Sequence, residues 1–74
     1  MKKNALAESI GDAFRSLRES RGISQEAFAE EISMHRTYYS ALERGEINLT
    51  LKTLKRVSTG LGVKMWEVLK VANS

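Results

Sequence analysis

The residues with the most evident chemistry lie between positions 36 and 44, where cations and small side chains recur at helical spacing. At roughly 100° per residue, one face of a helix there carries Arg36, Thr37, Ser40, Ala41 and Arg44. Arginine can donate two hydrogen bonds to guanine, and a threonine methyl can touch thymine. Short side chains between two arginines let a helix approach a surface closely. This face therefore predicts contact with base edges in the major groove of double-stranded DNA.

Composition argues against catalysis and against metal binding. The 74-residue chain has no cysteine and one histidine, and its carboxylates are dispersed along the chain. Thiolate zinc sites and thiol nucleophiles are therefore excluded. We expect no enzymatic activity, no metal, no cofactor and no small-molecule ligand. No apolar run approaches the ~20 residues of a membrane span, and no secretory signal is present, so we expect a cytoplasmic protein without membrane contact.

The length and the apolar periodicity predict one all-α domain over residues 1–74. Five short helices are expected at about 5–20, 25–32, 35–44, 51–61 and 64–72, and no segment alternates with the period of a strand. Helices this short are unstable alone in water, so their apolar faces must pack together. The positions expected to face the core are Leu6, Ile10, Ala13, Phe14, Leu17, Ala27, Phe28, Ile32, Leu51, Leu54, Val57, Leu61, Met65, Val68, Leu69 and Ala72.

Two of the expected helices carry a recognisable pattern. Gln25-Glu26-Ala27-Phe28-Ala29, together with Arg36-Thr37-Tyr38-Tyr39-Ser40-Ala41-Leu42-Glu43-Arg44-Gly45, resembles the helix-turn-helix of phage Cro/CI-type (XRE-family) repressors. The resemblance extends over about residues 10–69. It implies a compact five-helix, lambda-repressor-like DNA-binding domain whose third helix enters the major groove.

A finer similarity concerns Arg36-Thr37-Tyr38 followed by Asn48-Leu49-Thr50, which looks like the controller proteins of restriction–modification systems. It implies a transcriptional autoregulator that binds a palindromic or pseudopalindromic operator as a homodimer, activating at low occupancy and repressing at high occupancy. An antitoxin of a toxin–antitoxin pair and a phage-type repressor use the same fold, and both remain open as alternatives.

The resemblance also implies roles for single residues. Base reading falls to Arg36, Thr37, Ser40 and Ala41, which form the expected base-reading face. Contacts with phosphates, or positioning of the reading helix, are expected of Gln25, His35, Tyr38, Arg44, Asn48, Thr50 and Lys52. Several of these have simpler interpretations: Gln25 as a helix-start residue, Tyr38 as a packing residue, Asn48 as a turn residue, His35 as a helix cap and Lys52 as a solvated cation.

Other implied features are architectural. In the family a glutamate at the position of Glu43 pairs with an arginine of the first helix, here Arg18. Ser33 stands where the family often has glycine, so the turn before the third helix requires a conformation that serine adopts only at some cost. His35 and Lys64 replace the usual caps of the third and fifth helices.

Two further surfaces are expected to bind proteins. Trp66, an aromatic residue expected to be exposed, predicts a dimer interface on the last helix, joined by Val63 and Val71. Its alternative role is to cover the domain's own small core. Glu26 and Glu30 lie one helical turn apart on the second helix, where regulators of this family can contact RNA polymerase. Their simpler interpretation is an exposed acidic face.

Overall fold

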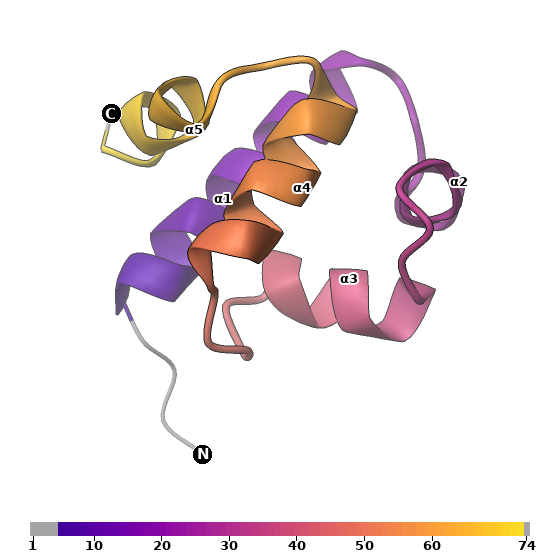
Figure 1. Cartoon of the computed structure of the whole chain (residues 1–74), viewed down its shortest axis with the longest axis horizontal. Helices are drawn as coiled ribbons and strands as arrows, with labels where there is room; N and C mark the ends of the chain where they lie inside the picture. Colours follow the sequence, from indigo (N-terminus) through magenta and orange to yellow (C-terminus); the bar gives the residue numbers. More distant parts are fainter. Residues whose placement is uncertain (1–4, 74) are drawn as a thin grey trace.

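The computed structural model describes residues 5–73, and the regular secondary structure within that range is helical. The helices are α1 (Ala5–Ser20), α2 (Gln25–Glu31), α3 (Arg36–Glu43), α4 (Leu51–Leu61) and α5 (Met65–Ala72). In Figure 1, α1 and α4 lie at the centre, while α3 and α5 lie at opposite ends of the molecule. The all-α, five-helix architecture expected from the periodicity is confirmed.

The helix boundaries follow from side chains that satisfy the first backbone N–H groups. The Ser24 Oγ accepts a hydrogen bond from the Ala27 N–H at 3.1 Å, and the Thr50 Oγ1 accepts one from the Thr53 N–H at 3.1 Å. At Lys64, the Glu67 carboxylate instead accepts a bond from the Lys64 N–H at 2.7 Å. Ser24 and Thr50 therefore cap α2 and α4.

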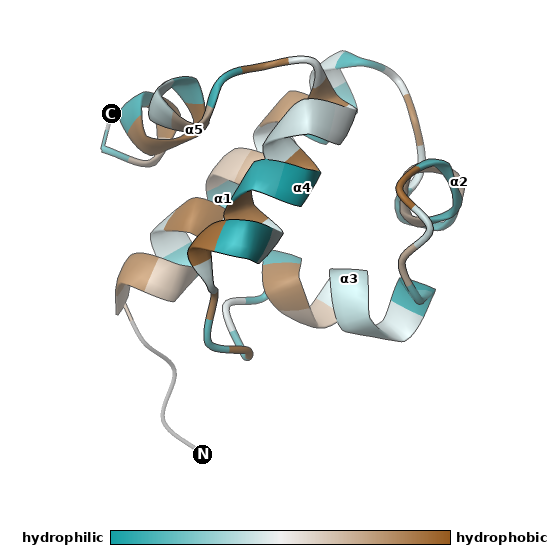
Figure 2. Ribbon diagram, in the orientation of Figure 1, coloured by the Kyte–Doolittle hydropathy of each residue, from teal (hydrophilic) through white to brown (hydrophobic). Residues whose placement is uncertain are grey.

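The core forms where the apolar faces of all five helices meet. Phe14, Phe28, Tyr39, Val57 and Val68 are fully buried there. Brown hydrophobic segments in Figure 2 occur on each helix, beside teal segments on the same ribbon, as expected of amphipathic helices. Each such helix gains its stability by burying the apolar stripe against its neighbours.

Five residues predicted for the core are instead exposed. They are Leu6, Ala27, Leu51, Met65 and Leu69. Leu51 is 77% exposed and Leu6 is 61% exposed, because each lies in the first turn of its helix and lines a groove rather than the packed core. The periodicity identifies the apolar face of a helix. It does not indicate how far along that helix a neighbouring helix packs against this face.

A close approach between α1 and α3 fixes the position of α3. A Cβ on Gly11 would lie 2.5 Å from the carbonyl oxygens of both Leu42 and Glu43. Only glycine allows α1 to pass this near to the C-terminal end of α3. The helix that carries the expected base-reading face is therefore seated directly on α1.

Within residues 5–73, every helix is too short or too polar to cross a lipid bilayer.

Candidate nucleic-acid interface

The expected base-reading face lies on the outer side of α3. Arg36 and Thr37 are exposed in the first turn, and Ser40 and Ala41 are half-buried one turn later. Because α3 lies at one edge of the molecule (Figure 1), this face is accessible from outside the described part of the chain. The first turn is the part of a recognition helix that usually meets base edges.

The opposite side of α3 is buried and holds the helix in place. Tyr39, Leu42 and Glu43 are all buried. The Tyr39 ring packs edge-on against Phe28 of α2, with ring centroids 5.1 Å apart and an interplanar angle of 64°. Such aromatic pairs add to the stabilisation that burial provides. The two helices of the helix-turn-helix, α2 and α3, are thus packed against each other.

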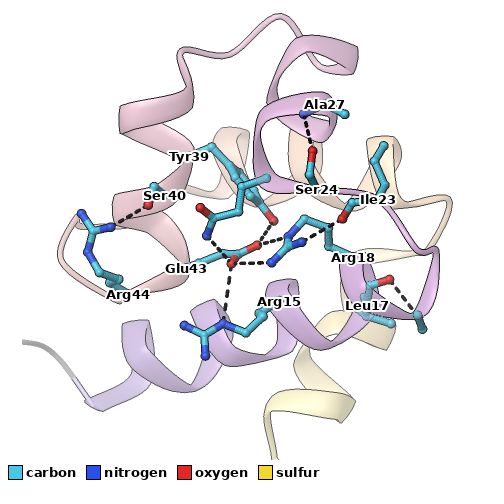
Figure 3. Close-up of polar contacts among 12 residues, drawn as sticks. Arg15, Leu17, Arg18, Ile23, Ser24, Ala27, Tyr39, Ser40, Glu43 and Arg44 are labelled. Carbon is cyan, nitrogen blue, oxygen red and sulfur yellow. Dashed lines mark hydrogen bonds and ion pairs between the residues drawn. The ribbon is translucent and has the colours of Figure 1, made fainter.

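A buried polar cluster around Glu43 connects three helices (Figure 3). Arg18 of α1 donates to both oxygens of the Glu43 carboxylate, at 2.6 and 3.2 Å. The Tyr39 hydroxyl donates to Oε2 at 2.5 Å, and the Gln25 amide donates to Oε1 at 2.7 Å. The ion pair between Arg18 and Glu43 that the resemblance implied is confirmed.

Tyr39 and Arg15 were not predicted as members of this cluster. The Arg15 guanidinium lies 3.7 Å from Oε1 of Glu43 and remains about half exposed, at 48%. The spacing of Tyr39 and Glu43, four residues apart on one helix, is the signal that could have found that contact. Gln25 braces α3 through Glu43, as the resemblance implied, and its contact with a phosphate stays a prediction.

Electrostatics keep the Glu43 carboxylate ionised. Burial by itself would raise the pKa of Glu43, but hydrogen bonds from Arg18, Tyr39 and Gln25 outweigh burial and lower that pKa below its usual value. Burial, followed by the hydrogen bond to Glu43, raises the pKa of Tyr39. The hydrogen bond to Glu43 also raises the pKa of Arg18. At neutral pH the cluster therefore holds one ionised carboxylate and at least one permanent cation.

Arg44 links the base-reading face to the loop that follows α3. It donates to the Ser40 Oγ at 2.6 Å and forms an ion pair with Glu46 at 3.0 Å. The hydrogen bond with Glu46 raises the pKa of Arg44. Arg44 and Ser40, which are both expected to contact DNA, are thus hydrogen-bonded to each other. Glu46, which was not predicted as part of the site, is ion-paired with Arg44.

The turn between α2 and α3 contains Ser33 in the conformation that serine adopts only at some cost. Ser33 is left-handed, with φ of 54°, and it is the only residue other than glycine with a positive φ within residues 5–73. His35 caps α3, since its Nδ1 accepts a hydrogen bond from the Thr37 N–H at 3.2 Å. Capping is therefore the role that the structure gives His35, and a phosphate contact from this residue stays a prediction.

The remaining residues predicted to contact phosphates surround this helix. Tyr38, Asn48, Thr50 and Lys52 are all exposed. Thr50 also caps α4, whose N-terminus directly follows the loop from α3. The N-terminus of a helix carries partial positive charge that favours phosphate. Asn48, Thr50, Lys52 and this helix end therefore follow the C-terminal end of α3, whereas Tyr38 lies in its first turn.

The residues predicted for the dimer interface differ in exposure. Trp66 is 62% exposed, whereas Val63 and Val71 are half-buried against the core. Nearby, Leu6, Leu51 and Leu69 help to line a groove of about 410 Å³. This groove was not predicted, because Leu6, Leu51 and Leu69 were assigned to the core.

Comparison with known proteins identifies the class that this fold and this exposed helix face define. The helix-turn-helix family model matches residues 14–65, which is most of the chain. The chain belongs to this family, and it is a DNA-binding transcriptional regulator. Within the family it is homologous to the control proteins of restriction–modification systems.

Individual relatives support this placement. The chain is 39% identical to the control protein C.MunI of Mycoplasma sp. over 66 residues, which covers 88% of this chain and 89% of the relative. It is 40% identical to C.BamHI of Bacillus amyloliquefaciens over 61 residues, covering 81% of this chain and 75% of the relative. The relatives are regulators rather than enzymes, in line with the composition.

Solved structures agree with the sequence comparison. The restriction–modification controller protein C.AhdI from Aeromonas hydrophila superposes with a TM-score of 0.82 and 31% identity, over 88% of this chain and 98% of that chain. The C.Esp1396I tetramer in complex with its natural 35 base-pair operator gives a TM-score of 0.84 and 29% identity, over 97% of this chain and all of that chain.

Proposed function

We propose that this protein is the controller of a restriction–modification system, which binds a palindromic operator as a homodimer and regulates transcription from it. The observation that carries the proposal is the exposed first turn of α3, a helix that is held at its C-terminal end by the buried Glu43 cluster. A rigid helix with an accessible reading face is what direct readout requires. The antitoxin and phage-repressor alternatives have less support, because relatives at 39–40% identity are control proteins.

In this proposal, the residues around α3 divide into two groups. Arg36 and Thr37 contact base edges, and Ser40 and Ala41 line the same groove. The contacts with phosphates come from Gln25, His35, Tyr38, Arg44, Asn48, Thr50 and Lys52. Phosphate contacts set the register of the protein on the duplex, whereas base contacts select the sequence.

The homodimer places two copies of α3 in successive turns of the major groove, about 34–36 Å apart. We propose that the partner copy covers the apolar surface of Trp66, Leu51, Leu6 and Leu69. Trp66 and Leu69 lie one turn apart on α5, and Leu69 lines the same groove as Leu6 and Leu51. Val63 and Val71 contribute less, because each is already half-buried in its own subunit.

Sedimentation analysis tests the dimer surface. Leu51→Glu places a charge in the proposed interface and should shift the protein towards monomer, since Leu51 contributes little to the core. Lys55→Glu, on an exposed position of the same helix, is the matched control and should leave the association unchanged. A Leu51→Glu variant that sediments as the wild type does would exclude this surface.

We also propose that Glu26 and Glu30 contact RNA polymerase. Both are exposed, and they lie one turn apart on α2. In a promoter-fusion assay, changing both to lysine should abolish activation while leaving operator binding intact. Glu19→Lys, on the exposed surface of α1, is the control for a change of charge. Activation that survives the double substitution would exclude this contact.

Selection of bound duplexes from a random pool tests the DNA-binding proposal as a whole. The expected result is an enriched palindrome whose half-sites are centred about 10 base pairs, or a multiple of that, apart. Binding without any enriched sequence would contradict sequence-specific regulation.

A further inference from the structure

The turn that joins α2 to α3 is conformationally demanding. Ser33 adopts the left-handed conformation at a φ of 54°, which side chains other than glycine rarely occupy. Backbone hydrogen bonds from the Ser33 N–H to the Glu30 carbonyl at 3.1 Å, and from the Met34 N–H to the Ala29 carbonyl at 2.8 Å, close this turn. Arg36 follows three residues after Ser33. The geometry of this turn therefore sets the direction in which α3 begins.

A guanidinium from another helix binds the outside of the same turn. Arg56 of α4 donates to the Ile32 carbonyl from Nε at 3.1 Å and from Nη2 at 2.7 Å. Its Nη2 also donates to the Ser33 carbonyl at 2.5 Å. The last turn of α2 has no basic residue of its own. Arg56 thus supplies the positive charge that the carbonyls at a helix C-terminus favour.

Gly60 brings α4 close enough for this contact. A Cβ at Gly60 would collide with Cγ2 of Ile32 and would also lie 3.2 Å from Cζ of Phe28. Because Gly60 lies one helical turn after Arg56, the same face of α4 that carries the arginine rests directly on the end of α2. The contact is therefore a packed junction between α4 and the helix-turn-helix.

We propose that Arg56 is a positioning residue for DNA reading: it holds the strained turn at Ser33 and thereby fixes the angle at which α3 presents Arg36 and Thr37. This inference rests on the proposed reading role of α3. It assigns Arg56 a function distinct from that of the neighbouring exposed cation Lys55.

Binding to the selected operator duplex and to a scrambled duplex tests the proposal. Arg56→Gln should lower the affinity for the selected operator duplex about tenfold, as expected for the partial loss of one bidentate base contact. Lys55→Gln, which removes the same charge one residue away, should lower binding to both duplexes by a similar small factor. Arg56→Gln should therefore reduce the ratio of specific to non-specific affinity, and Lys55→Gln should not.

Rescue through the turn itself separates positioning from general destabilisation. Glycine adopts the left-handed conformation without strain, so Ser33→Gly added to Arg56→Gln should restore most of the specificity ratio. An equal effect of Arg56→Gln and Lys55→Gln, or a failure of Ser33→Gly to rescue, would overturn the proposal.

Amide hydrogen exchange gives a second measurement that needs no DNA. Arg56→Gln should speed exchange of the Ser33 and Met34 amides, and Lys55→Gln should leave it unchanged. If the wild-type protein selects no duplex, the proposed function fails, while exchange still reports whether Arg56 holds the turn. Unchanged exchange in Arg56→Gln would show that it does not.

Discussion

Arg18 binds both carboxylate oxygens of Glu43 and so joins α1 to the last residue of α3. The same guanidinium donates to the Ile23 carbonyl at 2.8 Å, in the segment before α2. A single side chain of α1 therefore connects to both helices of the helix-turn-helix. Because these groups are buried and mutually satisfied, removing Glu43 leaves Arg18 buried without its counter-charge. The orientation of the reading helix depends on this pair.

Replacing Glu43 with glutamine keeps its shape and removes its charge. We expect a loss of about 3 kcal/mol in the free energy of unfolding at pH 7, since Arg18 is left buried without an anion. Urea unfolding followed by circular dichroism measures this loss. A loss below that of an exposed substitution such as Glu19→Gln would show that the ion pair contributes little.

The lowered pKa of Glu43 also predicts the pH dependence of stability. The unfolded value is near 4.5, so the contribution of the ionised carboxylate is complete above that pH and is lost as pH falls through the lower folded pKa. The stability of the wild type should decline over this acid range, and the gap between wild type and Glu43→Gln should shrink. A gap that stays constant down to acid pH would contradict the lowered pKa.

Tyr39→Phe removes one hydroxyl from the cluster while keeping the ring against Phe28. The lost hydrogen bond has a charged acceptor, so we expect a loss of about 2 kcal/mol in the free energy of unfolding. Thermal unfolding measures the loss, and Tyr38→Phe, at the exposed neighbouring position, is the matched control. Equal stability of the two variants would show that Glu43 does not need the Tyr39 hydroxyl.

Most of the fold could be predicted because its signals are local. The apolar period places the five helices, and Ser24 and Thr50 mark where two of them begin. The exposure of Leu6 and Leu51 could not be predicted in this way. It depends on where a neighbouring helix ends, and that is a tertiary property.

The candidate site could be predicted only in part, for a similar reason. Arg36 and Thr37 are neighbours on one helix, so their shared exposure follows from spacing. The pairing of Arg44 with Glu46 depends on the left-handed Gly45 between them, which changes the chain direction after α3. The contact of Arg56 with Ser33 joins residues that are distant in sequence, and no local pattern indicates it.

Two substitutions should separate base reading from phosphate binding. Arg36→Ala should cost about 1–3 kcal/mol in operator binding and relax the base preference at one position. Lys52→Ala should weaken binding to all sequences alike and reduce the slope of log affinity against log salt by about one. Competition binding at several salt concentrations measures both effects. An unchanged base preference in Arg36→Ala would place the reading face elsewhere.

Glu46 is expected to restrain the affinity for DNA. Its carboxylate holds Arg44 in an exposed ion pair at 3.0 Å, and a phosphate must compete with it for the guanidinium. Glu46→Gln should therefore raise operator affinity by about two- to fivefold, a small factor because exposed ion pairs are weak. The salt dependence of binding should become steeper, since Arg44 then neutralises a phosphate more fully. Glu19→Gln makes the same change in net charge without releasing Arg44, so an equal gain from both substitutions would show that the effect is only one of overall charge.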